Sequence, residues 1–413
     1  MVMINFSTQA AEATLRMRKL FPATPLQRND YLSIAYGADI WLKREDLSPV
    51  RSYKLRGAYN AMSKQADKQV FVCASAGNHA QGVAFVCKHV RKSGVIFMPV
   101  TTPQQKISKT KLFGGGWVEV RLVGDYFDDT LHASQTYCAE VGGHFLSPFD
   151  DLDVIEGQAT VTHELLEQLE GAPDILVVPV GGGGLSSSAR RLLMERAPDT
   201  EIFYVEPTGG KSLAAAVLAG EPTTIKNVDT FVDGAAVACI GKHTFAALKG
   251  IDADHVLAIP EDRICTTILE MLNIEGVVLE PAGALALDAL KDLKEKIKGK
   301  TVVCVSSGGN FDFERLPEVK ERAQRFAGVK KYFILRMPQR PGALKDFLGL
   351  LGPDDDISRF EYLKKSARNF GTVLLGVETS SPENFVSLLE RLENAGMSIR
   401  DITGDEAMVD LII

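Results

Sequence analysis

The sequence predicts an α/β protein of two lobes, built on mostly parallel open sheets and followed by a smaller C-terminal module. Between residues 70 and 310, short β-branched runs alternate with longer stretches of helical periodicity, and the pattern changes after residue 325. The short runs are apolar at nearly every position rather than at every second one. Strands of this kind are typical of parallel sheets that helices cover on both faces.

Seven runs in this part are short and rich in Val, Ile and aromatic residues, which predicts strands. They span residues 69–74, 95–100, 117–122, 175–180, 202–206, 255–259 and 301–306. The stretches between them, such as GNHAQGVAFVCKHV and SSSARRLLMERA, place apolar residues at helical spacing. This alternation predicts the open α/β sheets of the first domain.

The C-terminal residues predict the order strand, helix, strand, strand, helix, strand. A Ser cap and a final Gly delimit the second helix, in SPENFVSLLERLENAG, and the last strand is expected at MVDLII. The order βαββαβ describes a ferredoxin-like module. We therefore expect two domains, residues 1–325 and residues 326–413.

Composition and charge narrow the function classes. The 413 residues carry a net charge of −7, which argues against general affinity for nucleic acid or anionic membranes. No apolar run has the length of a membrane-spanning helix, and the N-terminus lacks the apolar core of a signal peptide. The six cysteines are scattered singly, mostly in apolar runs, which favours buried thiols in a reducing cytoplasm.

The strongest single motif is the run of four glycines in ILVVPVGGGGLSSSARR, between a buried strand and a helix. Glycine lets several backbone N–H groups converge there, and the helix N-terminus adds positive partial charge, so the loop suits a phosphate. It matches neither the Walker loop nor the dinucleotide-binding fingerprint, which disfavours a nicotinamide-dependent dehydrogenase. The alternative is a plain turn, but four glycines carry a high cost in backbone entropy.

A second motif, ASAGNHAQG at residues 74–82, joins another strand to another helix through small residues. Ser75, Asn78 and His79 lie at its tip, beside the free N–H groups of the helix. Open α/β sheets bind ligands at the carboxyl ends of their strands, so we expect a carboxylate to bind here. Helix capping by Ser75 or Asn78 is the alternative and is compatible with ligand binding.

Two weaker motifs follow, VSSGGN at 305–310 and LEPAGALAL at 279–287. In the second, Glu280 precedes Pro281 at a helix start, and taken alone it is expected to be a structural residue that favours the helix dipole.

Lys54, in RSYKLRGAYN, stands between an aromatic residue and Leu55. By itself it is typical of a solvated lysine at a helix start. A phosphate loop and a carboxylate-binding tip in the same chain point instead to pyridoxal phosphate, whose aldehyde forms a Schiff base with a lysine amine.

The motifs SYKLRGA, SAGNHAQG, PVGGGGL, EPAGA and SGGN stand in the order found in fold-type II pyridoxal-phosphate enzymes. Among these the chain resembles the threonine dehydratases over about residues 5–320. The C-terminal part, including RPGAL at 340–344, resembles one copy of the ACT-like regulatory domain of the biosynthetic enzymes. The resemblance implies the tryptophan synthase β-like fold for the first domain and a regulatory role for the second.

Transferred position by position, the resemblance implies a role for each matching residue. Lys54 would hold the cofactor and act as general base, with Tyr53 packed against the ring. Asn78 would bind the ring hydroxyl, Ser307 would face the ring nitrogen, and Gly234 would pass close to the ring. The phosphate would lie on Gly181, Gly182, Gly183, Gly184 and Leu185. The substrate carboxylate would lie among Ser75, Asn78 and His79, and an effector would bind at Arg340, Gly342, Ala343 and Leu344.

Three departures from the family pattern stand out. Tyr53 replaces the usual Phe, and the span from Lys54 to Asn78 is a few residues short, near residues 64–69. Some relatives bind a cation beside the phosphate loop through a Glu like Glu206. The stretch PTGGKS that follows lacks a second acidic residue, so we expect no metal.

The implied reaction is the elimination of water from L-threonine, or from L-serine, with 2-oxobutanoate and ammonia formed from threonine. This is the first step of isoleucine biosynthesis, so isoleucine is the expected effector, and relatives suggest a homotetramer. The tail as an oligomerisation module without a ligand remains an alternative.

The rival functions on this fold are L-serine dehydratase and serine racemase. The ACT-like tail disfavours both, and Ala76 stands where the racemase has a proton-carrying serine. A catalytically silent amino-acid sensor is a further alternative, which the intact lysine and glycine loop disfavour.

Overall fold

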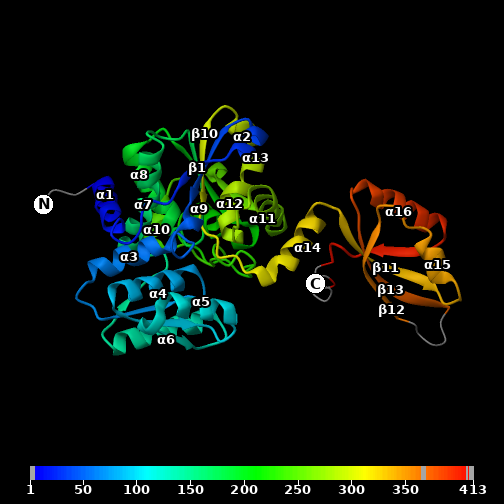
Figure 1. The fold of residues 1–413 in the computed structure, drawn as a ribbon, viewed down its shortest axis with the longest axis horizontal. Helices are drawn as coiled ribbons and strands as arrows, with labels where there is room; N and C mark the ends of the chain where they lie inside the picture. The colour runs from blue at the N-terminus through cyan, green and yellow to red at the C-terminus, as the bar shows by residue number, and fades with distance from the viewer. Residues whose placement is uncertain (1–4, 364–368, 406–407, 409–413) are drawn as a thin grey trace. The chain divides into compact units, whose positions relative to one another are not determined.

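The computed structural model describes residues 5–363, 369–405 and 408. Its contacts divide the chain into two compact units, Met1–Phe311 and Asp312–Ile413 (Figure 1). The domain boundary between residues 325 and 326 stays a prediction. The last expected strand, MVDLII, lies outside the described residues apart from Met408.

The first unit contains a six-stranded sheet in the order β1-β2-β10-β7-β8-β9. All neighbouring strands are parallel except β1 and β2. The strands are β1 (Leu26–Arg28), β2 (Asp39–Arg44), β7 (Ile175–Pro179), β8 (Glu201–Pro207), β9 (Val256–Ile259) and β10 (Thr301–Ser306). Strand β7 is buried at every residue, which explains its uniformly apolar sequence.

A second, four-stranded parallel sheet in the order β5-β4-β3-β6 forms the smaller lobe of this unit. The strands are β3 (Val70–Ala74), β4 (Ser93–Met98), β5 (Val118–Leu122) and β6 (His144–Phe145). Phe71 and Ile96 enter one core, whereas the neighbouring Val72 and Phe97 enter another. Both faces are therefore covered, with α4 and α5 on one side and α6 on the other (Figure 1).

The helices of the first unit connect these strands. They are α1 (Phe6–Met17), α2 (Asp30–Tyr36), α3 (Lys54–Lys64), α4 (Asn78–Val90), α5 (Gln104–Gly114), α6 (Phe127–Glu140), α7 (Leu152–Gln168), α8 (Gly184–Arg196), α9 (Ser212–Ala219), α10 (Lys242–Leu248), α11 (Glu261–Glu275), α12 (Pro281–Asp288) and α13 (Leu290–Ile297). Helix α4 follows β3 and α8 follows β7, so both motifs lie at carboxyl ends of parallel strands.

The second unit is a ferredoxin-like module preceded by a helix. Its elements are α14 (Leu316–Phe326), β11 (Lys330–Pro338), α15 (Ala343–Leu348), β12 (Asp356–Leu363), β13 (Phe370–Glu378), α16 (Glu383–Asn394) and β14 (Ser398–Asp401). The antiparallel sheet has the order β12-β13-β11-β14. Phe333 and Leu375 of the sheet and Phe385 of α16 share one core. The predicted βαββαβ order is confirmed.

All seven strands predicted in the first domain are present, whereas β1, β2 and β6 were not predicted. Among the residues that the structure describes, no helix combines the length and the apolar character that a membrane crossing requires.

Candidate active site

Lys54 is the first residue of α3, and its amine lies among apolar groups. The Nζ atom donates a hydrogen bond to the Pro148 carbonyl at 2.8 Å. It lies 5.3 Å from the centroid of the Tyr53 ring and 5.9 Å from that of Phe149. Burial lowers the pKa of Lys54 from 10.5 to about 8, against the opposing charge of Glu280. A neutral amine is therefore accessible near physiological pH.

Phe149 lies near both this lysine and the glycine loop. A Cβ at Gly182 would lie 2.2 Å from the Phe149 ring, so the ring packs directly on the backbone there. Gly183 has a φ of 89°, and a Cβ there would lie 2.9 Å from Thr244. Only glycine fits both positions, and the loop ends at the first N–H groups of α8, where an anion is favoured.

A series of close contacts connects the glycine loop to Ser307. A Cβ at Gly181 would lie 3.4 Å from the Gly234 carbonyl oxygen, and one at Gly234 would lie 2.9 Å from Cβ of Ala282. The Ser307 hydroxyl donates to the Ala282 carbonyl at 3.2 Å, and the Ser307 carbonyl accepts from the Tyr53 N–H at 3.2 Å. These four segments, far apart in the sequence, thus meet beside Lys54.

The half-buried Asn78 and the buried Glu280 form a pair that sequence reasoning missed. Asn78 Nδ2 donates to Glu280 Oε1 at 2.6 Å, and Asn78 Oδ1 accepts from Asn310 at 2.7 Å. The sequence predicts a structural role for Glu280 when it is taken alone, and the structure adds the hydrogen bond to Asn78, whereas the Glu280 side chain makes no capping hydrogen bond to α12. Asn78 likewise does not cap α4. A Cβ at Gly308 would lie 2.0 Å from Glu280 Oε1, so the carboxyl group packs directly on the SGGN loop, and no local sequence pattern indicates this proximity.

The Glu280 carboxyl is electrostatically unusual. Burial first, and then the nearby Asp233, raise its pKa from 4.5 to about 7. The hydrogen bond from Asn78 and the charges of Lys106 and Lys109 oppose this rise. A proton is therefore available on a carboxyl group next to Asn78 at neutral pH.

His79 is buried on the inner side of the same tip. Its Nε2 lies 3.0 Å from the Leu146 carbonyl, which can only accept, so Nε2 carries the proton. Its Nδ1 is buried and has no partner among residues 5–363, 369–405 and 408. Burial, then the charge of Lys54, lowers its pKa to about 3, so the ring is neutral. Ser75 Oγ accepts from the Gly77 N–H at 3.2 Å, at the end of β3.

The remaining predicted residues lie elsewhere or contribute backbone only. The Leu185 side chain is buried in the core beside β7, so the loop there can offer its backbone N–H. In the second unit, Arg340 Nη2 lies 2.7 Å from Asp346 Oδ2, and Gly342, with a φ of 80°, precedes α15. Ala343 is buried and Leu344 is exposed.

Glu206 serves the fold in this structure. Its carboxylate accepts the backbone N–H groups of Leu213 and Ala214 at 2.6 and 2.9 Å, at the start of α9. Within the described part of the chain, no three His, Cys, Asp or Glu side chains gather as metal ligands would.

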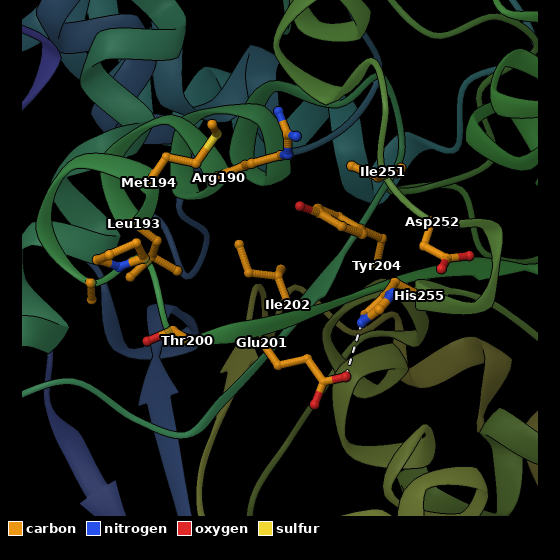
Figure 2. A pocket seen from close by; sticks show the side chains of 12 residues that line it. Arg190, Leu193, Met194, Thr200, Glu201, Ile202, Tyr204, Ile251, Asp252 and His255 are labelled. Atoms are coloured by element: carbon orange, nitrogen blue, oxygen red, sulfur yellow. Dashed lines mark hydrogen bonds and ion pairs between the residues drawn. The ribbon is translucent and has the colours of Figure 1, made fainter.

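A cavity of about 250 Å³ lies apart from these residues, between α8, β8 and the segment before β9. Figure 2 shows the Tyr204 hydroxyl facing the space between Arg190 and Ile202, and the ion pair of His255 with Glu201 at 2.9 Å on its rim. None of the predicted site residues lines this cavity. The candidate site is therefore the cluster around Lys54.

Two family models match the chain. One, described as a pyridoxal-phosphate dependent enzyme, matches residues 18–308. The other, described as the C-terminal regulatory domain of threonine dehydratase, matches residues 321–412.

Curated relatives and solved structures agree with these matches. The chain is 48% identical to the biosynthetic L-threonine dehydratase IlvA of Bacillus subtilis (strain 168), over 94% of this chain and 93% of the relative. It is 36% identical to the processed threonine deaminase isoform 2 of Solanum lycopersicum, with a TM-score of 0.71 over 77% of this chain and 93% of the other. Maize serine racemase is 26% identical, with a TM-score of 0.69 over 76% and 96% of the two chains.

The cluster around Lys54 fits the cofactor of this family. The lysine amine has a lowered pKa, the glycine loop leaves no room for a Cβ at Gly182 or Gly183 and ends at the first N–H groups of α8, and a buried hydroxyl lies at Ser307. The unpartnered Nδ1 of His79 adds a polar atom with no protein partner in the described ranges. These groups match the aldehyde, phosphate and ring of pyridoxal phosphate.

Proposed function

The chain belongs to the threonine dehydratase family of pyridoxal-phosphate-dependent enzymes, and from that premise we propose that it converts L-threonine to 2-oxobutanoate and ammonia. The observation that carries this proposal is the buried amine of Lys54, whose pKa is lowered to about 8 beside Phe149, a ring that packs on Gly182. The amine and the glycine loop proposed to bind the phosphate thus both lie close to one aromatic ring.

The side chains of the cluster supply positioning and proton transfer. When bound, the cofactor supplies an aldehyde that joins an amine and a conjugated ring that accepts electrons. The glycine loop and the start of α8 would hold its phosphate, and Asn78 and Ser307 would hold its ring. Lys54 would remove the proton from Cα of threonine as general base. Lys54 would return that proton to the β-hydroxyl group, which would leave as water, and the resulting enamine would hydrolyse to 2-oxobutanoate and ammonia.

The purified chain should therefore release a 2-oxoacid from L-threonine only when pyridoxal phosphate is present. We expect a visible absorbance band that borohydride abolishes, and we expect Lys54→Ala to lose both band and activity. Lys64→Ala, at the other end of α3, is the matched control and should keep both. A band or activity that survives Lys54→Ala would contradict the assignment.

The racemase alternative can be separated by product analysis. Maize serine racemase shares the fold, but the tip of this chain has Ala76, which cannot carry a proton. Incubation with L-serine should give pyruvate and no D-serine on chiral chromatography. D-serine as the main product would favour the racemase.

We propose further that the second unit binds isoleucine near Arg340, Gly342, Ala343 and Leu344 and that this lowers activity, in a cytoplasmic homotetramer. The match to a threonine dehydratase regulatory domain supports the proposal. Coupling between two sites requires that the effector bind one state more tightly than the other. Isothermal titration with isoleucine, alongside an activity assay, is the test; no heat and no inhibition would contradict it. Sedimentation would give the subunit number.

A further inference from the structure

Four side chains from four separate segments form a hydrogen-bonded relay that ends at Glu280. Lys109 Nζ, on α5, donates to Asn310 Oδ1 at 2.5 Å. Asn310 Nδ2 donates to Asn78 Oδ1 at 2.7 Å, and Asn78 Nδ2 donates to Glu280 Oε1 at 2.6 Å. Lys109 and Asn78 belong to the smaller lobe, whereas Asn310 follows β10 and Glu280 precedes α12 in the larger one. The relay therefore spans both lobes of the first unit.

The chemistry of the partners fixes the orientation of both amides. Asn310 Nδ2 also donates to the Val50 carbonyl at 2.8 Å, and a carbonyl can only accept. The Lys109 ammonium can only donate, so it must face the oxygen of Asn310. Asn310 consequently presents its remaining N–H to Asn78 Oδ1, which turns Nδ2 of Asn78 toward Glu280. No other amide orientation satisfies all three neighbours.

We propose that Lys109 and Asn310 are positioning residues that hold the Asn78 amide so that Nδ2 faces Glu280 and its second N–H stays available for the cofactor. Across residues 5–363, 369–405 and 408, no hydrogen-bond acceptor takes that second N–H. The inference rests on the proposed function, since it assigns how Asn78 is prepared to donate to the ring hydroxyl. Without Asn310, the Asn78 amide could turn and place its own oxygen, rather than its N–H groups, against Glu280 Oε1 and the ring hydroxyl.

A neighbouring ion pair gives a control for the simpler idea that these contacts only hold the lobes together. Lys106, three residues before Lys109 on α5, pairs with Asp233 of the larger lobe. This pair crosses between the same lobes but has no hydrogen bond to Asn310 or Asn78 in the described ranges. If lobe contact alone mattered, loss of Lys106 and loss of Lys109 would have similar effects.

The experiment compares cofactor binding and the absorbance of bound pyridoxal phosphate in the full-length chain. Asn310→Asp is nearly isosteric but places an acceptor against the Val50 and Asn78 oxygens. We expect it to weaken cofactor binding about tenfold, as loss of a buried hydrogen bond does, and to shift the absorbance maximum. Lys109→Met should shift the maximum in the same direction with a smaller loss of affinity. Lys106→Met removes a charge that also acts on Glu280 but removes no hydrogen bond to either amide, so it should change both quantities less than Lys109→Met does.

Each outcome decides a different point. A wild-type chain that takes up no pyridoxal phosphate would contradict the proposed function and this inference with it. A wild-type chain that binds the cofactor, with spectra unchanged in Lys109→Met and Asn310→Asp, would overturn the inference alone. Equal shifts in Lys106→Met and Lys109→Met would also overturn it, in favour of lobe contact. If Asn310→Asp does not fold, as judged by circular dichroism, the Lys109 and Lys106 variants still decide.

Discussion

Lys54 is made reactive by its surroundings rather than by a charged neighbour. Burial penalises the ammonium form and lowers the pKa to about 8, although Glu280 opposes the shift. In the cofactor-free protein, the acylation rate of Lys54 should therefore rise with pH and reach half its maximum near pH 8. Competitive acylation with peptide mass spectrometry measures this, with the exposed Lys111 as internal reference for the reagent. A midpoint near 10.5 would show that burial does not lower the pKa.

Glu280 makes stability depend on pH in a defined direction. Its pKa is raised from 4.5 to about 7, so between these values the folded state holds a proton that the unfolded state releases. This contribution to stability is fully present below pH 4.5 and is lost as pH rises through 7. In cofactor-free protein, Glu280→Gln should become progressively more stable relative to wild type across that window, by on the order of 3 kcal/mol. Urea unfolding at pH 4.5 and at pH 8 gives the difference in the free energy of unfolding between the two proteins. An equal difference at both pH values would contradict this prediction.

Individual site residues could be predicted from the sequence where their type is unusual for the surrounding residues. Four consecutive glycines are rare without a function, so Gly182 could be singled out, and Lys54 gained significance only together with that loop and the tip at residues 75–79. The partnership of Glu280 with Asn78 could not, because it joins residues 202 positions apart. A glutamate before a helix has a sufficient local explanation in the helix dipole.

Helix α3 is anchored by Arg56, which lies two residues after Lys54 on the same helix. Arg56, fully buried, pairs with Glu45 at 2.8 Å and with Glu164 at 2.7 Å. Lys43 also reaches Glu164, at 2.8 Å. These contacts tie the start of α3 to α7 and to the 3-10 turn Glu45–Leu47 that follows β2, so the position of Lys54 depends on a buried network two residues away.

Removal of Arg56 should therefore be costly. Arg56→Met leaves two buried carboxylates without their main partner, and we expect a loss of about 3–5 kcal/mol in the free energy of unfolding. Lys64→Ala removes ion pairs of a partly exposed lysine at the other end of α3, to Asp153 and to the buried Glu156, which keeps Arg16 as a partner; it should cost at most about 1 kcal/mol. Urea unfolding followed by circular dichroism gives both values. Equal losses in the two variants would show that the buried network does not anchor the helix.

The elements that the sequence missed have physical reasons. Strands β1 and β6 have three and two residues, too few for a periodic pattern. Strand β2 ends in Lys43 and Arg44. Both side chains are buried and form ion pairs, which no local sequence pattern reveals. By contrast, β7 and β10 are apolar and of ordinary length, so they could be predicted.

The contacts of helix α14 bear on the position of the domain boundary. Its Glu321 pairs with Lys330 of β11 at 2.5 Å, and Gln324 donates to Glu378 of β13 at 3.1 Å. The Lys330 side chain is only 9% exposed, so it relies on these carboxylates. These contacts join α14 to the ferredoxin-like module, and the boundary between residues 325 and 326, which falls in the last turn of α14, stays a prediction.

Two fragments of the second unit test this boundary. Residues 312–413 keep α14, and residues 326–413 lack it. If α14 belongs to the module, the shorter fragment leaves the Lys330 ammonium with one carboxylate fewer and should be less stable, by about 1–3 kcal/mol. Thermal unfolding followed by circular dichroism compares them, and Glu321→Gln in the longer fragment should reproduce part of the loss. Equal stability of the two fragments would instead support a boundary between residues 325 and 326, with α14 acting as a connection between two independently folded parts.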